Sequence, residues 1–357
     1  MNVSVSRAVS VCIASSTLYL GFIQSSLASE NDTLISYKTT QTITLDGQPE
    51  KEWEKAKPLT MLLDYMPYKP DQYEGMLKTQ YSIKSLHDDQ NIYFFVQWDD
   101  PTKSVDRFPW VKQDDDSWKQ HKNLDQTGHE NTYYEDKASI FWAINAKGFS
   151  KKGCDIACHL ADEEGKVADI EQKSAGRKYT RKDGETIDMW HWKAVRTGLT
   201  DQFDDQFVDA TKDPAANRNW GRKGDSKTGG GYQNNINEDK SEPAYGGLVM
   251  NLDDNYVIQD IDKAPFIDTY KPGDKLPGIV VSPFTGSRGD ISSKAVWADG
   301  KWTLEFQRKL VTTGENAAVE DVQFSDLSET YYFGVSVFDN SQINHIYHEG
   351  ALKLNFK

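Results

Sequence analysis

Hydrophobic and polar residues alternate along many short segments of the chain, a pattern typical of β-strands with one buried face. The clearest case is residues 294–310, where two alternating runs flank Asp299 and Gly300, a dipeptide that favours a tight hairpin turn. Further strands are predicted as a pair within 81–100, at 138–146, 331–339 and 351–356, and at the start of 43–59 before a helical turn around Trp53. Many short strands with turns between them predict an antiparallel β-sandwich.

Two polar stretches interrupt this pattern. Residues 101–136 are highly charged, and residues 200–245 are rich in Asp, Gly, Asn and Lys. Such segments bury little apolar surface, so we predict that both are long loops. Because the strands on either side fit one sandwich, we expect a single domain over residues 29–357 with two insertions, although the length would allow two domains.

The first 28 residues have the pattern of a secretory signal peptide. One basic residue, Arg7, precedes an apolar run that ends in a small-residue site at 26–28. We therefore expect cleavage after Ala28 and a periplasmic protein. The apolar run is short and is interrupted by Ser and Thr, so no stable membrane insertion is expected.

The charge balance is acidic, with a formal net charge of −14 at pH 7. A nucleic-acid-binding protein needs an excess of Lys and Arg to contact phosphates, so nucleic acid is not expected as a partner. The negative field could attract a basic redox partner, or it could serve solubility alone.

The segment KGCDIACHL, residues 152–160, contains the most informative chemistry of the chain. A haem c is attached through thioether bonds to two cysteines, and the histidine after the second cysteine binds the iron, commonly with the spacing C-x-x-C-H. Here Cys154 and Cys158 are four residues apart and His159 follows directly. On a helical turn, residues i and i+4 share one face, so both sulfurs can reach one porphyrin edge. This predicts one covalent haem c with His159 as the proximal ligand.

Two other interpretations of the cysteine pair stay open. A disulfide between Cys154 and Cys158 is compatible with their spacing, but a disulfide does not need the adjoining histidine. A zinc site would need a fourth ligand and usually a second Cys or His pair close by, and His191 is the candidate considered for it.

A haem in an electron carrier usually has a second axial ligand, either Met or His. The segment NHIYHEG between two predicted strands offers His345 and His348, and we expect one of them to be the distal ligand. His191, which Trp190 and Trp192 flank, is the next candidate, and these residues could line a haem pocket or belong to the core. Met189 and Met250 are the thioether candidates, whereas His87, His121 and His129 are predicted to be exposed in turns and loops.

The chain resembles the haem-binding domain of ethylbenzene dehydrogenase-related cytochromes, a family that includes the cytochrome c-552 and dimethyl sulfoxide reductase-like haem-binding subunits. The resemblance runs from Ile43 to Phe356. It rests on the order of the motifs LDGQPEKEWEKA, IYFFVQWDD, GCDIACH, DMWHWKA, SRGDISSKAVWADGKWTLEFQRKL and FGVSVFDN. The opening motif and the W-x-D-G-x-W hairpin are also similar to sandwich modules of the carbohydrate-binding and DOMON types.

The resemblance implies a β-sandwich that holds one haem and passes electrons. In the molybdenum-enzyme subunits of the family the haem is b-type, with Met and Lys as ligands, and this chain has GCDIACH in place of their ligand loop. For this chain the resemblance implies a covalent haem c, with His159 as the proximal ligand and His345 or His348 as the distal ligand. The departure puts in doubt that the chain is a molybdenum-enzyme subunit.

These observations predict a periplasmic monohaem c-type cytochrome that carries single electrons and is not an enzyme. Its partner would be a basic cytochrome or a periplasmic oxidoreductase. The alternative from another class is an exported β-sandwich module that binds carbohydrate or another ligand, with a Cys154–Cys158 disulfide. A haem sensor with an open sixth position is a third interpretation.

Overall fold

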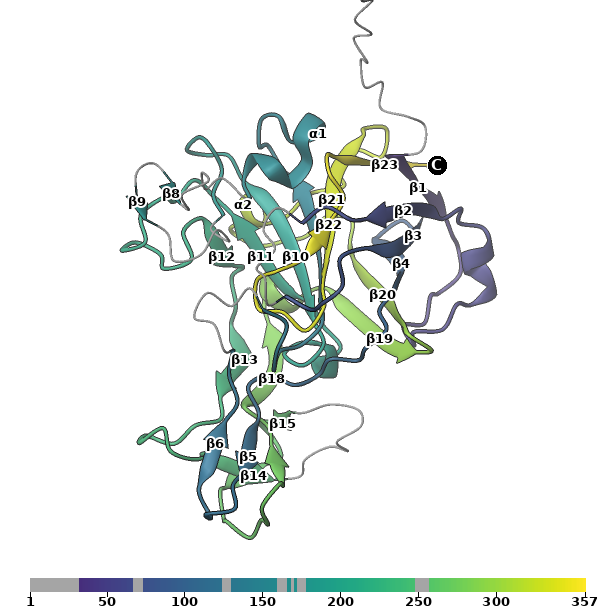
Figure 1. Ribbon diagram of the computed structural model, residues 1–357. Helices are drawn as coiled ribbons and strands as arrows, with labels where there is room; N and C mark the ends of the chain where they lie inside the picture. Colours follow the sequence, from purple (N-terminus) through teal and green to yellow (C-terminus); the bar gives the residue numbers. More distant parts are fainter. Residues whose placement is uncertain are drawn as a thin grey trace, which may run out of the picture. The chain divides into compact units, whose positions relative to one another are not determined.

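The core of the protein is one large, strongly curved sheet, seen in a computed structural model that describes residues 32–66, 73–123, 130–158, 166–167, 170–171, 178–247 and 257–357 (Figure 1). Within these residues the sheet has 13 strands. They are β1 (Thr33–Lys38), β2 (Leu59–Leu63), β3 (Thr79–His87), β4 (Asn91–Asp99), β7 (Lys137–Ala143), β10 (Ile187–Lys193), β11 (Asp204–Val208), β12 (Arg222–Gly224), β19 (Ser292–Ala298), β20 (Lys301–Lys309), β21 (Tyr331–Phe338), β22 (Ile346–Tyr347) and β23 (Leu352–Phe356).

The strand order is β12-β11-β10-β7-β21-β23-β1-β3-β4-β20-β19, with β2 beside β3 and β22 beside β21. All pairs are antiparallel except those of β1, which runs parallel to both β23 and β3. The strands predicted in 81–100, at 138–146, at 331–339 and at 351–356 are confirmed as β3, β4, β7, β21 and β23. The helical turn at Trp53 is confirmed as a 3₁₀ turn, η2 (Lys51–Glu54), but residues 43–50 before it form no strand.

The hairpin of β19 and β20 turns at the predicted dipeptide. Asp299 and Gly300 have φ angles of 52° and 74°. Two successive residues with positive φ give the turn whose twist matches the flanking strands, which is why Asp-Gly was the signal for it.

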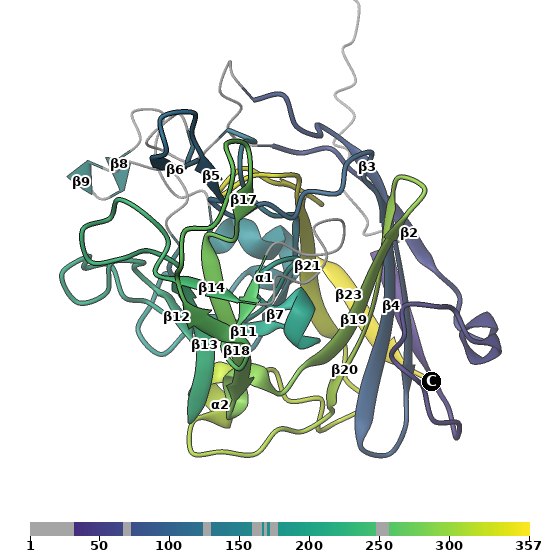
Figure 2. The ribbon, with the colours of Figure 1, turned by 90° about the horizontal axis from the view of Figure 1, so that it is seen from below.

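The two halves of the sheet face each other across an aromatic core, as Figure 2 shows for β7 and β21 on one side and β4 and β20 on the other. Phe94 of β4 contacts Trp142 of β7 and Trp190 of β10, with ring centroids 5.9 and 5.8 Å apart. Trp192 of β10 contacts Trp302 of β20 at 5.0 Å. These contacts between opposing strands make the fold a β-sandwich, as the alternating pattern predicted.

Hydrogen bonds also join the two ends of the sheet. The amide of Phe203, just before β11, donates to the carbonyl of Ile291 at 3.1 Å, and the amide of Ser293 in β19 donates to Asp201 at 2.7 Å. The segment just before β11 is therefore hydrogen-bonded to β19 and the residue before it, at the opposite end of the strand order. This pairing reduces the exposed edge of the sheet.

The two polar stretches are more ordered than predicted. The structure places β5 (Trp110–Lys112) and β6 (Trp118–Gln120) in the first, and β11, β12, β13 (Gly229–Asn234) and β14 (Tyr245–Gly247) in the second. The remaining short strands are β8 (Lys166–Val167), β9 (Ile170–Glu171), β15 (Ile258–Gln259), β16 (Lys263–Pro265), β17 (Lys275–Leu276) and β18 (Ile279–Thr285). The prediction of loops throughout was wrong, in part because charged residues of two of these strands are buried in ion pairs. These are Lys112 of β5 with Asp268 and Asp204 of β11 with Lys193.

Helical segments are short. They are α1 (Phe149–Lys152), α2 (Ala317–Glu320) and the 3₁₀ turns η2, η3 (Gly153–Ile156), η4 (Gly198–Thr200) and η5 (Ser287–Gly289). Within the described residues, no helix has the length and apolar character needed to cross a membrane.

Candidate functional site

The cysteine pair lies on a single helical turn, as the spacing predicted. Helix α1 leads into η3, and the amide of Cys158 donates to the carbonyl of Cys154 at 2.9 Å, which is the i to i+4 bond of an α-turn. Both cysteines are free and buried. Their side chains therefore point to one side of the turn, into a cluster of apolar residues with Phe141, Ile187 and Met189.

The turn is fixed against the segment after β22 by a close backbone approach. Gly153 has a φ of 58°, and a Cβ at this position would lie 2.2 Å from the carbonyl oxygen of Gly350. The Tyr347 hydroxyl also donates a hydrogen bond of 2.6 Å to Asp155 Oδ1. The predicted ligand segment 344–350 is thus in direct contact with the cysteine turn, although far from it in sequence.

The two thiols interact with each other. A hydrogen bond with Cys158 raises the pKa of the Cys154 thiol well above its usual range, and burial acts in the same direction. The same bond lowers the pKa of Cys158, so Cys158 is the more readily ionised thiol of the pair. Because the thiolate is the reactive form, the two sulfurs differ in nucleophilicity.

The cysteines lie on the outer face of β21, β7 and β10, the face that points away from the aromatic core. Cys154 Sγ is 3.6 Å from the position that a Cβ would take at Gly334 in β21. Gly334 pairs with Phe141 in β7, which pairs with Met189 in β10. These three residues form one row across the three strands, which we call a rung, and it is the rung nearest to the thiols.

The next rung on the same face contains the predicted ligand His191. Ser336 of β21 pairs with Ser139 of β7, and Ser139 pairs with His191 of β10. Two residues along a strand span about 6–7 Å, so this rung lies that far from the cysteine rung along the strands. The His191 side chain is buried, and neither ring nitrogen has a hydrogen-bond partner. The Ser139 hydroxyl is also buried without a partner.

An unsatisfied buried imidazole is unusual, because buried polar groups in proteins are nearly always hydrogen-bonded. Burial lowers the pKa of His191 well below its ordinary range, and nearby cations lower it further. The ring is therefore neutral, and one nitrogen has a free lone pair. This is the state in which a histidine binds a metal.

The third rung on this face is cationic. Phe338 of β21 pairs with Lys137 of β7, which pairs with Lys193 of β10. The cations that act on His191 are Lys193, Lys137, Arg222 and Arg196. Asp204 pairs with Lys193, and Glu135 pairs with Arg196. Positive charge thus exceeds negative charge in this group of side chains.

His345 is also on the side of the cysteines. Its ring lies 4.7 Å from that of Phe338 and 5.9 Å from that of Tyr347, and Nδ1 is 2.8 Å from the carbonyl oxygen of Ile343. If Nδ1 donates to this carbonyl, Nε2 is left with a lone pair, which is the common arrangement of a metal-binding histidine. His348 is in a different environment: its Nδ1 is buried without a partner, and the charged groups around it are acidic.

The structure separates some of the other predicted residues from this face. Trp190 points into the aromatic core, where its Nε1 donates to Asp188 at 2.9 Å, because neighbouring residues of a strand point to opposite faces. His159, the predicted proximal ligand, lies outside the described residues, as do Met250 and His129. His87 was predicted to be exposed but is buried, 3.1 Å from the Ser36 hydroxyl.

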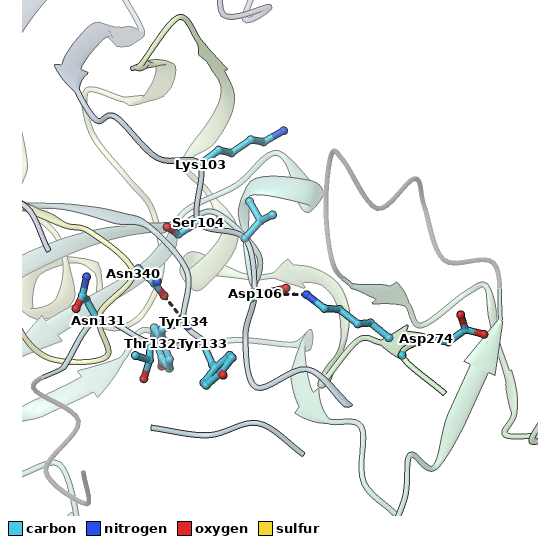
Figure 3. A pocket seen from close by; sticks show the side chains of 12 residues that line it. Lys103, Ser104, Asp106, Asn131, Thr132, Tyr133, Tyr134, Asp274 and Asn340 are labelled. Carbon is cyan, nitrogen blue, oxygen red and sulfur yellow. Dashed lines mark hydrogen bonds and ion pairs between the residues drawn. The ribbon is translucent and has the colours of Figure 1, made fainter. Parts of the chain in front are cut away.

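A polar pocket of about 740 Å³ adjoins the cationic end of the face (Figure 3). Tyr134 lines it, and the Tyr134 hydroxyl accepts a hydrogen bond of 3.2 Å from Arg196. Lys275 and Asp106 form an ion pair across its wall. None of the predicted cysteine or histidine ligands lines this pocket, so it is a neighbour of the candidate site and not part of it.

A protein-family comparison decides where the chain belongs. A family model described as Ethylbenzene dehydrogenase matches residues 50–350, which is most of the chain. The chain belongs to the ethylbenzene dehydrogenase family. This confirms the resemblance found in the sequence motifs, and the haem-binding subunits connected with the family indicate a redox role for this member. No curated protein shows significant similarity to the chain.

Solved structures with a similar arrangement of strands include a carbohydrate-binding module of family 9 from Caldicellulosiruptor kristjanssonii. The complex with glucose has 9% sequence identity and a TM-score of 0.32, over 90% of this chain and 95% of that one. The complex with cellotriose has 10% identity and a TM-score of 0.33, over 91% and 94%. Similarity at this level supports no inference about ligands.

Sequence reasoning missed the cationic rung of this site. Lys137 lies just before the predicted strand at 138–146, and Lys193 lies in the motif DMWHWKA, where no strand was predicted. The strand period of two offered a signal, since it places Lys193 on the same face as His191 and Met189. Which strand lies next to which cannot be read from local patterns, so the meeting of Lys137 with Lys193 was not predictable.

Proposed function

We propose that the protein is a monohaem c-type cytochrome that carries single electrons, with Cys154 and Cys158 as the attachment points and His159 as the proximal ligand. The observation that supports this most is the buried His191 ring, which has no hydrogen-bond partner and lies on the same sheet face as the two free thiols. Bound haem supplies a reversible one-electron couple, Fe(III)/Fe(II).

The order of side chains along the face fits the order of groups across a haem. The porphyrin has its vinyl groups at one edge, the iron at the centre and two propionates at the opposite edge. The thiols are at the first rung, His191 is at the second and the lysines are at the third. Cations at the far end would balance the propionates, because a buried carboxylate needs a charged partner.

Among the histidines we propose His191 as the distal ligand, ahead of His345 and His348. His191 comes from the middle of β10 in a rigid sheet, and both of its nitrogens lack partners. His345 already uses Nδ1 in a contact with a backbone carbonyl and lies beyond Phe338. His348 lies among acidic groups.

Two histidine ligands leave no open position for a substrate, which favours electron transfer over catalysis. We infer a periplasmic location from the signal-peptide pattern of residues 1–28 and a basic redox partner from the net charge of −14. Association with such a partner would weaken as ionic strength rises.

The test of the ligand assignment is the absorption spectrum of holoprotein variants made with haem c maturation proteins. H191A is expected to lose the low-spin ferric spectrum and to bind carbon monoxide rapidly when reduced, whereas H348A, at a half-buried histidine, keeps the wild-type spectrum. H191M should stay low-spin with a higher reduction potential, because methionine ligation raises the potential. A wild-type spectrum for H191A would overturn the assignment, and loss of the low-spin spectrum in H345A alone would place the ligand at His345.

A further inference from the structure

A second group of chemically unusual side chains lies on the opposite face of the sheet from the cysteines. Asp205 of β11, Asp225 after β12 and Asp321 after α2 each place a carboxylate oxygen within 4.8 Å of the others. All three are buried, with exposed fractions of 0%, 3% and 0%. They come from three separate segments that the fold brings together.

Two of the three carboxylates are poorly satisfied by the protein, whereas Asp321 accepts hydrogen bonds from Arg308 and Thr312. Neither oxygen of Asp225 has a hydrogen-bond partner, and Asp205 Oδ2 has none. Asp188, which is fully buried and within electrostatic reach of both, has an unpartnered Oδ1. Orphan oxygens of this kind indicate a missing electropositive group, since buried acceptors are otherwise paired.

The charges of the cluster do not balance. Asp188 and Asp290 add two carboxylates to the three of the cluster. Among the described residues, the cation that pairs with them is Arg308, at 3.1 Å from Asp188 and 3.3 Å from Asp321. One guanidinium cannot balance five buried carboxylates, and burial accordingly raises the pKa of Asp188, Asp205, Asp225 and Asp290. A bound cation would let these groups ionise in place of taking up protons.

We propose that Asp205, Asp225 and Asp321 bind a calcium ion. A hard cation is indicated because all donors are carboxylate oxygens. Calcium–oxygen distances are about 2.3–2.6 Å, so two oxygens on one ion can be up to about 5 Å apart, and the 4.8 Å limit of this cluster fits. Magnesium keeps several waters and demands a strict octahedron, whereas these side chains are almost fully buried, which favours calcium.

The ion would link strand β11, near the edge of the sheet, to the segments that follow β12 and α2. Next to the cluster, Ser226 Oγ donates to Glu320 at 2.8 Å, and the amide of Arg288 donates to the carbonyl of Ser226 at 3.1 Å. The segments after β12, η5 and α2 thus already meet here. A calcium ion would bind β11 through Asp205 and the segments after β12 and α2 through Asp225 and Asp321, and it would stabilise the folded state against unfolding.

The test is calcium binding by full-length protein stripped with a chelator, measured by equilibrium dialysis with radioactive calcium, together with the melting temperature. One calcium per chain, a melting temperature that rises with calcium and falls with chelator, and loss of this response in D225N and D205N are expected. D239N, at an exposed aspartate, should respond like wild type.

Three results would overturn the proposal. They are no calcium retained by the wild-type protein, a full calcium response in D225N, or equal responses to calcium and magnesium. The wild-type dialysis stands even where a variant fails to fold. None of these measurements depends on haem, so the calcium site and the proposed function can fail separately.

Discussion

Tyr347 donates its hydroxyl hydrogen bond to Asp155 at 2.6 Å, which ties β22 to the turn that holds Cys154 and Cys158. Y347F removes this bond. A net loss of about 0.5–1.5 kcal/mol in the free energy of unfolding is expected, which is the usual contribution of one hydrogen bond. Urea denaturation measures it.

The matched control is Y65F. Tyr65 packs edge-on against Tyr347 at 5.1 Å but is 41% exposed. Its loss of a hydroxyl should change the free energy of unfolding by less than about 0.5 kcal/mol. Equal effects of Y347F and Y65F would show that the bond to Asp155 contributes nothing.

Gly153 is the residue whose backbone allows the cysteine turn to form. In G153A the new Cβ would meet the carbonyl oxygen of Gly350 at 2.2 Å, so the backbone must move. G184A is the control, because Gly184 also has a positive φ, of 81°, but has no atom within 4 Å of the added Cβ. We expect G184A to cost about 1–2 kcal/mol from its backbone conformation alone.

G153A should therefore lower the free energy of unfolding by clearly more than G184A, and it should reduce the yield of covalent haem while G184A does not. Both quantities can be measured on the same preparations. Similar behaviour of the two variants would contradict the close approach of Gly153 and Gly350.

The aromatic core should dominate stability. Phe94 is fully buried and stacks on Phe306 with ring centroids 5.0 Å apart. F94A is expected to lower the free energy of unfolding by about 3–5 kcal/mol, from lost burial and the cavity left behind. L62A, at a residue 47% exposed, should change it by less than about 0.5 kcal/mol. A small effect of F94A would contradict the sandwich packing of β4 on β7 and β10.

The pH dependence of stability should reflect the buried Asp100. Burial, and next the charge of Asp339, raises the pKa of Asp100 to about 7 in the folded protein. The unfolded chain has a pKa near 4, so between these values the folded state holds a proton that the unfolded state releases. The contribution of Asp100 to stability is therefore present at low pH and is lost as pH rises from about 4 to about 7.

D100N should remove this loss, so the variant gains stability over wild type as pH rises to 8. The amide oxygen can still accept the Thr102 amide hydrogen that now bonds Asp100 Oδ1 at 3.1 Å. Urea denaturation at a series of pH values, with the exposed D114N as control, measures the difference. A variant that is least stable relative to wild type at pH 8 would contradict the direction.

Local sequence patterns predicted where strands and turns form better than they predicted which strands pair. The alternation in 294–310 with Asp299 and Gly300 fixes a hairpin by itself, because pairing and turn are adjacent in sequence. The parallel pairing of β1 with β23 joins residues more than 300 apart, and no local signal specifies it. The strand β11 was missed because it begins with two aspartates, and the burial of the first, Asp204, depends on ion pairs with Lys193 and Arg288.

In the candidate site too, local features were predicted from the sequence and long-range contacts mostly were not. The spacing of Cys154 and Cys158 predicted a helical turn, which is present, and the segment of His345 was expected near it, which is also the case. The period of a strand would have separated Trp190 from His191, since adjacent residues point to opposite faces. The third rung of cations depends on strand order, which only the structure supplies.

The most direct test of the central claim is the reduced pyridine haemochrome spectrum of the protein after acid–acetone extraction. The protein would be produced with residues 1–28 included, in a host that matures c-type cytochromes. We predict a c-type spectrum that stays with the polypeptide at one haem per chain, and that is lost in the double variant C154S/C158S. A colourless wild-type protein, with Cys154 and Cys158 joined in a disulfide, would contradict the assignment.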